Sequence, residues 1–201
     1  SSIEPNLVSK KILQIMSKSK KAMPHFHIPL QSGSNKILKL MKRRYTKEQY
    51  IDIIKDINKF IPNVSIGVDV IVGFPAETNK DYIDTYNLLS ELDVSYFHVF
   101  TYSERDNTEA NNISPKVDMD IKKNRRKLLM QLSEEKNKKY INKNINKKSK
   151  ILFESYNSGY LSGLTENYIR VHAKGDEKML NEIKNIKITN NSDIVMGVVV
   201  E

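Results

Sequence analysis

The sequence contains no cysteine, and this absence excludes several classes of chemistry. Without thiols, the chain itself offers no disulfide, no thiolate metal site and no cysteine nucleophile. It also has no apolar run near the roughly 20 residues that a membrane-spanning helix needs, so we expect no membrane role. The first residues, SSIEP, have neither a signal-peptide layout nor an initiator methionine. We therefore expect a cytoplasmic segment cut from a longer chain.

The positive charge is concentrated in one segment. Residues 116–150 hold 13 Lys/Arg and 4 Asp/Glu, a net charge of +9, which equals the formal net charge of the whole chain. Such a block predicts contact with a polyanion, and RNA is favoured over a membrane because the apolar face has few aromatic residues. The alternative is a solvated surface helix. The 201 residues, 39% of them hydrophobic, suit one large or two small globular domains.

Apolar spacing predicts alternating strands and helices over the first half of the chain. A capping box at Thr46–Gln49 should open the helix that ends at Phe60. This order indicates an α/β architecture with right-handed crossovers. The expected helices are 4–17, 36–44, 46–60 and 81–92, and the expected strands are 25–30, 64–74 and 94–102.

The second half of the chain differs from the first in composition and in the spacing of its apolar residues. Residues from about 118 to 148 read as one long basic helix. From residue 151, short runs such as ILFES, YIRVHA and IVMGVVV are separated by glycine and asparagine, which is typical of a small antiparallel barrel. We therefore expect one domain over 1–148 and a second over 149–201.

Three strand ends carry polar or glycine-containing loops: Gln31–Ser34, Gly73–Glu77 and Thr101–Arg105. Because the carboxyl ends of parallel strands meet at one rim, these loops should lie together and form a ligand site. Small polar residues also cap helices, so each loop alone has a purely structural alternative.

A few side chains could carry chemistry. His25 and His27 alternate along a strand and could share a metal, but no third ligand is evident and packed strand histidines are commoner, so no metal site is predicted. His98 reads as a packed residue. Asp69 stands alone in an apolar strand, where it could bind a ribose or base of a ligand, or anchor a lysine or a helix end. Two more carboxylates could be general acids, ligand contacts or surface residues: Glu77 and Glu104.

Three long segments carry a family resemblance: HFHIPLQSGSNKILKLMKRRYT, IGVDVIVGFPAET and SYFHVFTYSERDNTEA. They resemble the tRNA methylthiotransferases of the radical S-adenosylmethionine (SAM) superfamily, and are closest to the branch that acts on N6-threonylcarbamoyladenosine beside the anticodon. GLTENYIRV and the final glycine–valine run resemble the TRAM domain, a small RNA-binding barrel.

The resemblance implies an enzyme with two [4Fe–4S] clusters, one of which cleaves S-adenosylmethionine, and a product with a methylthio group on carbon 2 of the adenine. Both cluster sites would precede Ser1, because this chain has no cysteine. The resemblance thus implies the C-terminal half of a partial barrel plus the TRAM barrel, inactive without the N-terminal cluster domain and the first half of the barrel. Alternatives are a non-catalytic tRNA-binding module or a relative that modifies a ribosomal protein.

The resemblance also implies a set of cofactor contacts. Gln31 and Ser32 should meet the ribose or amino-acid end of S-adenosylmethionine, and Arg43 should pair with its carboxylate. The remaining expected contacts are Glu4, Asp69, Val70, Gly73, Phe100 and Tyr102.

The RNA contacts are expected in two places. The long helix would meet tRNA phosphates, and tyrosines of the barrel could stack on unpaired anticodon-loop bases or serve as barrel core or surface. The barrel itself, from residue 151, carries 5 basic and 7 acidic residues, so the helix should supply the affinity. The expected RNA contacts are Lys122, Lys123, Arg125, Arg126, Lys127, Tyr156, Tyr160 and Tyr168.

Overall fold

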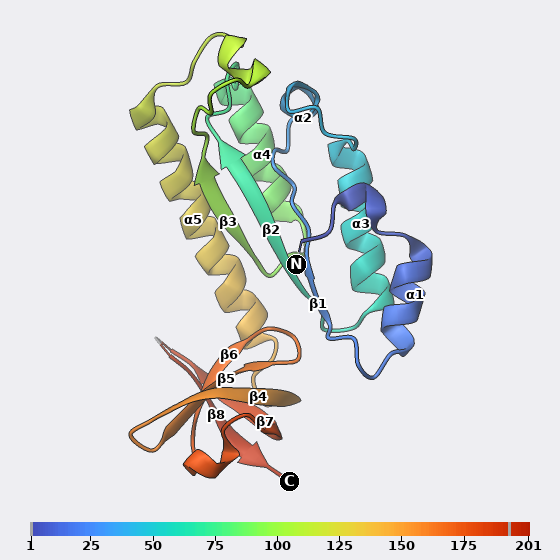
Figure 1. Cartoon of the computed structure of the whole chain (residues 1–201), viewed down its shortest axis with the longest axis vertical. Coiled ribbons are helices and arrows are strands. Elements are labelled where there is room, and N and C mark those ends of the chain that lie inside the picture. Colours follow the sequence, from blue (N-terminus) through green and yellow to red (C-terminus); the bar gives the residue numbers. More distant parts are fainter. Residues whose placement is uncertain (1, 193) are drawn as a thin grey trace.

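The computed structural model describes residues 2–192 and 194–201, and the chain folds into a three-stranded sheet with helices and a separate closed barrel (Figure 1). The strands of the sheet are parallel and run in the order β1-β2-β3. The α/β architecture followed by a small barrel is therefore as the sequence predicts. The elements of the first part are η1 (Pro5–Leu7), α1 (Lys10–Lys18), β1 (His25–His27), α2 (Asn35–Leu40), α3 (Lys47–Phe60), β2 (Ser65–Val72), α4 (Asn79–Glu91), β3 (Tyr96–Thr101), η2 (Glu109–Asn112) and α5 (Met119–Asn142).

Side-chain caps fix where the helices begin. The predicted capping box is present: Thr46 accepts from the Gln49 N–H, and the Gln49 side chain accepts from the Thr46 N–H. A second box joins Thr78 and Asp81, so α4 begins at Asn79 rather than at Asp81. A Ser, Thr, Asp or Asn cap typically contributes about 1 kcal/mol.

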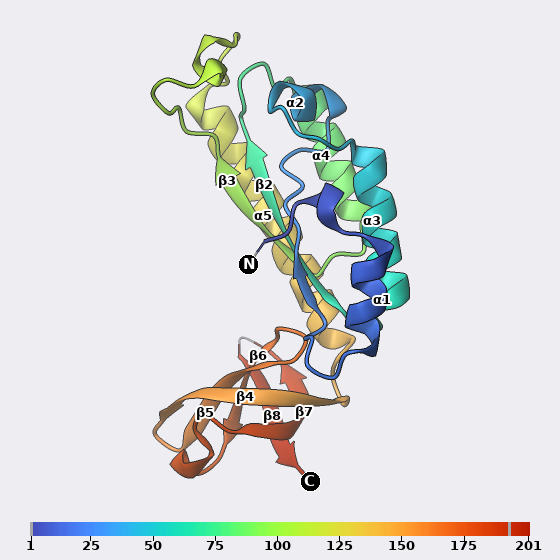
Figure 2. The same cartoon turned by 45° about the vertical axis from the view of Figure 1, so that its right-hand side comes forward.

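The sheet buries one face and leaves the other open. Ile66, Val68, Val70 and Val72 alternate along β2 and are at most 1% exposed, packed into the core beneath the helices. Because side chains alternate across a strand, Asp69 and Ile71 lie on the opposite face. The helices lie behind and beside this sheet (Figure 1, Figure 2), and Asp69 and Ile71 are partly exposed on the opposite, inner face.

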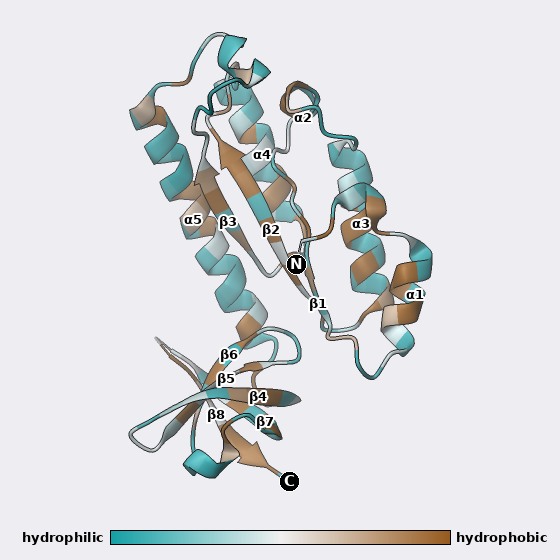
Figure 3. Ribbon diagram, viewed as in Figure 1, coloured by the Kyte–Doolittle hydropathy of each residue, from teal (hydrophilic) through white to brown (hydrophobic). Residues whose placement is uncertain are grey.

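The helix α5 ends at Asn142, earlier than the expected end near 148. Its hydrophilic surface is visible in Figure 3. The cap residue Lys143 is followed by Asn144, which is fully buried, and the chain turns before the barrel begins at Lys148. The apparent continuation of the basic pattern beyond residue 142 is thus a turn rich in asparagine and lysine.

The barrel consists of five strands closed in the order β4-β5-β6-β8-β7. Most neighbours are antiparallel, as expected, but β6 and β8 pair in parallel through His172 and Met196, which closes the ring. Phe153, Leu161 and Ile186 are completely buried inside it. The elements are β4 (Lys148–Asn157), β5 (Tyr160–Thr165), β6 (Arg170–Lys174), η3 (Glu177–Met179), β7 (Ile183–Asn191) and β8 (Val195–Val200).

Candidate functional site at the carboxyl ends of the strands

β2 and β3 end side by side at Val72 and Thr101, whereas β1 ends at His27, earlier than the expected Leu30, and the chain after it continues beside β2 to Gln31, which bridges to Val70 (Figure 1). A cavity of about 480 Å³ opens there and is lined by Gln31, by β2 and by the end of β3. Beside it lies a groove of about 990 Å³ between α2 and η2, and Arg43, Ile71, Tyr102 and Ala110 line both spaces. The cavity is lined by Gln31, Arg43, Asp69, Ile71, Phe100, Thr101, Tyr102, Ser103, Arg105, Thr108 and Ala110.

Gln31 is the most informative residue of this cavity. Its backbone has φ +67°, and its N–H and C=O pair with Asp69 O and Ile71 N at 2.9 and 3.0 Å. The side chain is 8% exposed, and its Oε1 is buried without a hydrogen-bond donor. Leaving a buried amide oxygen unsatisfied costs about 1–3 kcal/mol. This atom is therefore available to accept from a polar group placed in the cavity.

Ser32 turns the other way. Its hydroxyl is 3.3 Å from Thr85 Oγ1 and accepts from the Ser34 N–H, and it does not line the cavity. Gly33 packs so closely on α4 that an added Cβ would lie 2.6 Å from Thr85 Cα. Within the stretch QSGS, Gln31 therefore faces the cavity, whereas the next three residues pack the loop onto α4.

Arg43 brings a positive charge to the boundary between the cavity and the groove. Its NH1 lies 3.1 Å from Glu4 Oε1, and its Nε is buried without an acceptor. The segment that holds Glu4 runs beside β1, where the Ile3 N–H donates to His27 O. Glu4 therefore touches Arg43 rather than the cavity. The guanidinium retains a free donor for an anionic group.

The strand β2 contributes different residues from those expected. Val70 is fully buried on the helix side, and Gly73 does not line the cavity. Gly73 has φ +75°, donates its N–H to Glu77 Oε2, and lies against the Lys122 side chain. The period of two along the strand places Asp69 and Ile71 at the cavity. The same alternation in the sequence places Ile71 on the face of Asp69, although Ile71 is not among the expected contacts.

The end of β3 supplies two aromatic walls. Phe100 is 52% exposed, and the Tyr102 ring lies edge-on to Phe74 with their centroids 5.0 Å apart. Both line the cavity, as does Arg105, which belongs to the predicted rim loop Thr101–Arg105 but not to the expected cofactor contacts. An exposed aromatic surface beside fixed polar groups is the usual composition of a ligand site.

The basic residues of α5 separate into two groups. Lys122 and Arg125 are 9% and 6% exposed, and their heads donate to Tyr102 O and to the Glu77 carboxylate. Side chains buried in this way do not reach RNA phosphates, which corrects the expectation for these two residues. The exposed members of the set are Lys123, Arg126 and Lys127.

The three barrel tyrosines are 37–49% exposed. Tyr168 stacks on His25 of β1, with ring centroids 3.9 Å apart, whereas Tyr156 and Tyr160 lie near the β4–β5 hairpin. A cleft of about 670 Å³ between the sheet and the barrel is lined by Tyr168, Tyr96 and Arg170 among others. Only Tyr168 of the three tyrosines lines this cleft.

The cavity at the strand ends suits S-adenosylmethionine. The Gln31 oxygen can accept from a ribose hydroxyl or an ammonium group, the Arg43 guanidinium matches a carboxylate, and the aromatic walls match an adenine. An iron–sulfur cluster does not fit these residues, because the chain contributes no thiolate. No described helix is both long and apolar enough to cross a membrane.

Comparison with known proteins agrees with this geometry. Residues 1–89 match the model of the radical SAM superfamily. The threonylcarbamoyladenosine tRNA methylthiotransferases of Bacillus subtilis and Aquifex aeolicus are 37% and 41% identical over 193 and 175 residues, or 94% and 87% of this chain and 43% and 42% of those proteins. The tRNA-2-methylthio-N(6)-dimethylallyladenosine synthase of Campylobacter jejuni is 36% identical, over 96% of this chain and 45% of that protein.

The chain therefore spans less than half the length of these curated relatives. The radical SAM enzyme coproporphyrinogen III oxidase from Escherichia coli aligns with 67% of this chain and 31% of its own, with a TM-score of 0.56 and 15% identity, which is a likeness of fold alone. Taken together, the strand-end cavity, the superfamily match over residues 1–89 and these relatives make the chain similar, over most of its length, to a part of the radical SAM tRNA methylthiotransferases.

Proposed function

We propose that this chain is part of a radical SAM enzyme that adds a methylthio group to carbon 2 of a tRNA adenosine. The observation that carries the proposal is the strand-end cavity with its unsatisfied Gln31 oxygen, in a chain similar to this family. S-adenosylmethionine and iron–sulfur clusters supply the radical and sulfur chemistry when bound. The chain without cysteine is proposed to be inactive alone, with the cluster ligands supplied by other parts of the enzyme.

The residues of this chain position the cofactor. In the proposal, Gln31 accepts from the ribose or the ammonium group, and Arg43 pairs with the carboxylate while Glu4 holds the guanidinium in place. Phe100 and Tyr102 flank the adenine, and Asp69 limits the depth of the cavity. These contacts orient the cofactor and keep water from its reactive end.

The proposed substrate is N6-threonylcarbamoyladenosine next to the anticodon. Support comes from two relatives named for that nucleoside, at 37% and 41% identity. Dimethylallyladenosine is the second candidate, because relatives named for it are 36% and 38% identical.

The tRNA would be gripped outside the cofactor cavity. The exposed cations of α5 would meet phosphates of the anticodon stem-loop, and the barrel would be a TRAM-like RNA-binding domain. The proposal thus assigns residues 1–148 to the barrel half that binds the cofactor, and residues 149–201 to RNA recognition.

The test is deletion of the gene that encodes this chain, followed by mass spectrometry of nucleosides from total tRNA. We expect loss of 2-methylthio-N6-threonylcarbamoyladenosine and accumulation of its precursor without the methylthio group. Loss of the 2-methylthio group from dimethylallyladenosine would instead support the second candidate. An unchanged nucleoside profile would contradict both.

A point variant links the activity to the cavity. Gln31→Ala, introduced at the same locus, should reproduce most of the nucleoside loss because it removes the proposed cofactor contact. The matched control is Gln14→Ala on the exposed side of α1, which should leave the profile unchanged. Equal profiles for the two variants would remove Gln31 from the proposal.

A further inference from the structure

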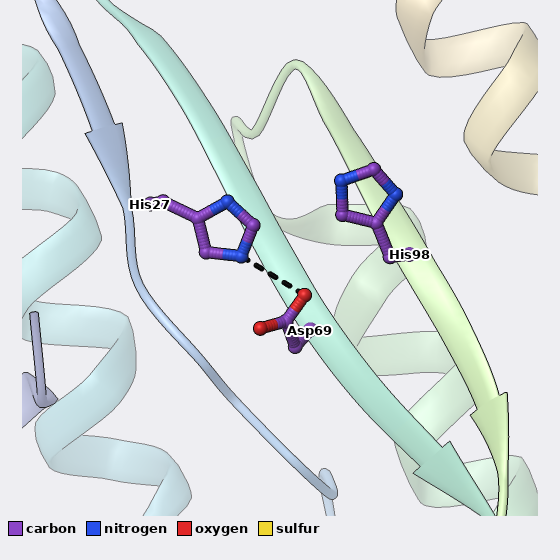
Figure 4. Close-up of side chains that lie close together, drawn as sticks. All are labelled: His27, Asp69 and His98. Carbon is purple, nitrogen blue, oxygen red and sulfur yellow. Dashed lines mark ion pairs between the residues drawn. The ribbon is translucent and has the colours of Figure 1, made fainter. Parts of the chain in front are cut away.

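Three potential metal ligands gather on the open inner face of the sheet, one from each strand. Asp69 of β2 lies directly opposite His98 of β3, and His27 of β1 lies opposite Gly67, two residues earlier on β2. Their side chains point to the same side of the sheet (Figure 4). His27 and His98 are 71 residues apart in the sequence, and only the parallel register brings them together with Asp69.

The ligand atoms are close enough to share one ion. One nitrogen of each histidine and one Asp69 oxygen all lie within 4.8 Å of one another, and His27 Nε2 is 2.9 Å from Asp69 Oδ1. Tetrahedral ligands at about 2.1 Å from a common ion lie about 3.4 Å apart. Binding therefore requires the widest pair to close by up to about 1.4 Å, which a change of rotamer of the exposed His98 side chain can supply.

Two polar groups of this cluster, His27 Nε2 and the Asp69 carboxylate, are not satisfied by the other residues that the structure describes. His27 Nε2 is buried and, despite its short distance to Asp69, makes no hydrogen bond of good geometry. Among the described residues, no Lys or Arg forms an ion pair with Asp69. A cation between the three side chains would satisfy both the nitrogen and the carboxylate.

His25 shows the contrast on the same face. Its Nε2 lies 3.1 Å from the Tyr96 hydroxyl, and its ring stacks on Tyr168. It is therefore engaged in the contact with the barrel. The pair suggested by alternation alone, His25 with His27, is replaced by a triad in which His25 has no part.

We propose that His27, Asp69 and His98 bind one divalent transition-metal ion such as Zn²⁺. Two imidazoles and one carboxylate favour zinc, cobalt or iron(II) over calcium or magnesium, which prefer all-oxygen sites. Three protein ligands leave at least one coordination position of the ion free. Because His98 is exposed, this free position faces the open side of the sheet. This site is separate from the cluster chemistry of the family, since its ligands are nitrogen and oxygen atoms of this chain.

The experiment is titration of the purified, chelator-treated chain with Zn²⁺ by calorimetry, and with Co²⁺ by visible absorption. The absence of cysteine simplifies the result, because no thiolate can bind either metal. We expect one ion per chain and cobalt bands free of any sulfur charge-transfer transition. His98→Ala should weaken zinc binding by more than about 100-fold, since removal of an outer-shell partner alone typically costs 10–100-fold.

Two matched variants separate the triad from general histidine binding. His172→Ala removes the histidine of the barrel, and His25→Phe keeps a ring on Tyr168. Both should retain the wild-type zinc affinity. His98 is exposed, so its alanine variant should fold, and its circular dichroism and melting temperature verify this. Binding that is absent, or equally affected by His98→Ala and His172→Ala, would overturn the proposal. Asp69 also lines the strand-end cavity, so the variants that test the metal are confined to histidines that do not line it.

Discussion

At the scale of single residues, His25 illustrates how a side chain is held neutral. Burial, followed by the nearby His27, lowers the pKa of His25 from 6.5 to about 4. The ring lies between Tyr168 of the barrel and Tyr96 of the sheet, with an interplanar angle of 13° to Tyr168. Protonation of His25 therefore opposes the stacked arrangement that joins the two parts of the molecule.

This arrangement predicts a specific loss of stability in mild acid. The unfolded chain binds a proton at His25 near pH 6.5, whereas the folded chain resists it until about pH 4. The contribution of His25 is thus complete above pH 6.5 and is lost as the pH falls to 4. We expect the loss to be about 1 kcal/mol after screening of a partly exposed ring.

Urea unfolding at several pH values measures this loss. In His25→Phe, which stacks without titrating, the free energy of unfolding should fall less between pH 6.5 and 4 than in the wild type. Parallel pH profiles for the two proteins would show that His25 does not contribute.

At the scale of elements, a buried ion pair connects the end of β2 to α5. The Glu77 carboxylate accepts from Arg125 NH1 and, at 3.0 Å, from the Gly73 N–H, and Arg125 also lies 5.2 Å from the Tyr82 ring centroid. Burial raises the pKa of Glu77, while the Gly73 N–H and Arg125 act against that rise. The pair fixes the GFPAE turn without entering the cavity.

Removing one partner should be more damaging than removing both. Glu77→Ala or Arg125→Ala leaves an uncompensated buried charge, so we expect a loss of about 3–5 kcal/mol in the free energy of unfolding. The double variant Glu77→Leu/Arg125→Met should recover part of that loss. Denaturant unfolding of the three variants measures the coupling, and strictly additive losses would contradict it. Lys127→Ala on the same helix is the exposed control.

The elements were predictable where a local signal exists. Capping residues and apolar periodicity identified α3 and the strands, and the change in composition and apolar spacing identified the barrel. What could not be predicted depends on contacts between distant segments. The direction in which Ser32 points follows from Gln31 adopting φ +67°, and the burial of Lys122 and Arg125 follows from packing of α5 on the strand ends. A basic pattern alone does not distinguish a solvated cation from one that anchors a loop.

At the scale of the whole molecule, a junction of asparagines joins the barrel to the sheet. The fully buried Asn144, just after α5, accepts from Asn63 before β2 at 2.7 Å and from Asn167 of the β5–β6 turn at 3.0 Å. The Tyr140 hydroxyl lies 3.2 Å from a backbone oxygen of each of the same two segments, and its single O–H can donate to either. One side chain thus bonds both parts of the molecule at once, which sets the width of the cleft between them.

Asn144→Leu should therefore weaken the junction as well as the fold. Asn167 would keep its amide donor buried without an acceptor, so we expect a loss of about 2–3 kcal/mol, within the range for unsatisfied buried groups. Asn124→Leu, on the exposed side of α5, makes the same substitution without removing a buried contact and serves as the control.

In calorimetry the wild type and the control should melt in one transition, because the junction couples the barrel to the sheet. The Asn144→Leu protein should melt in two transitions or one broadened transition, since the barrel retains its own core when the connection is lost. A single, equally sharp transition in all three proteins would mean that the covalent linker and the stacking of Tyr168 on His25 suffice to couple the two parts.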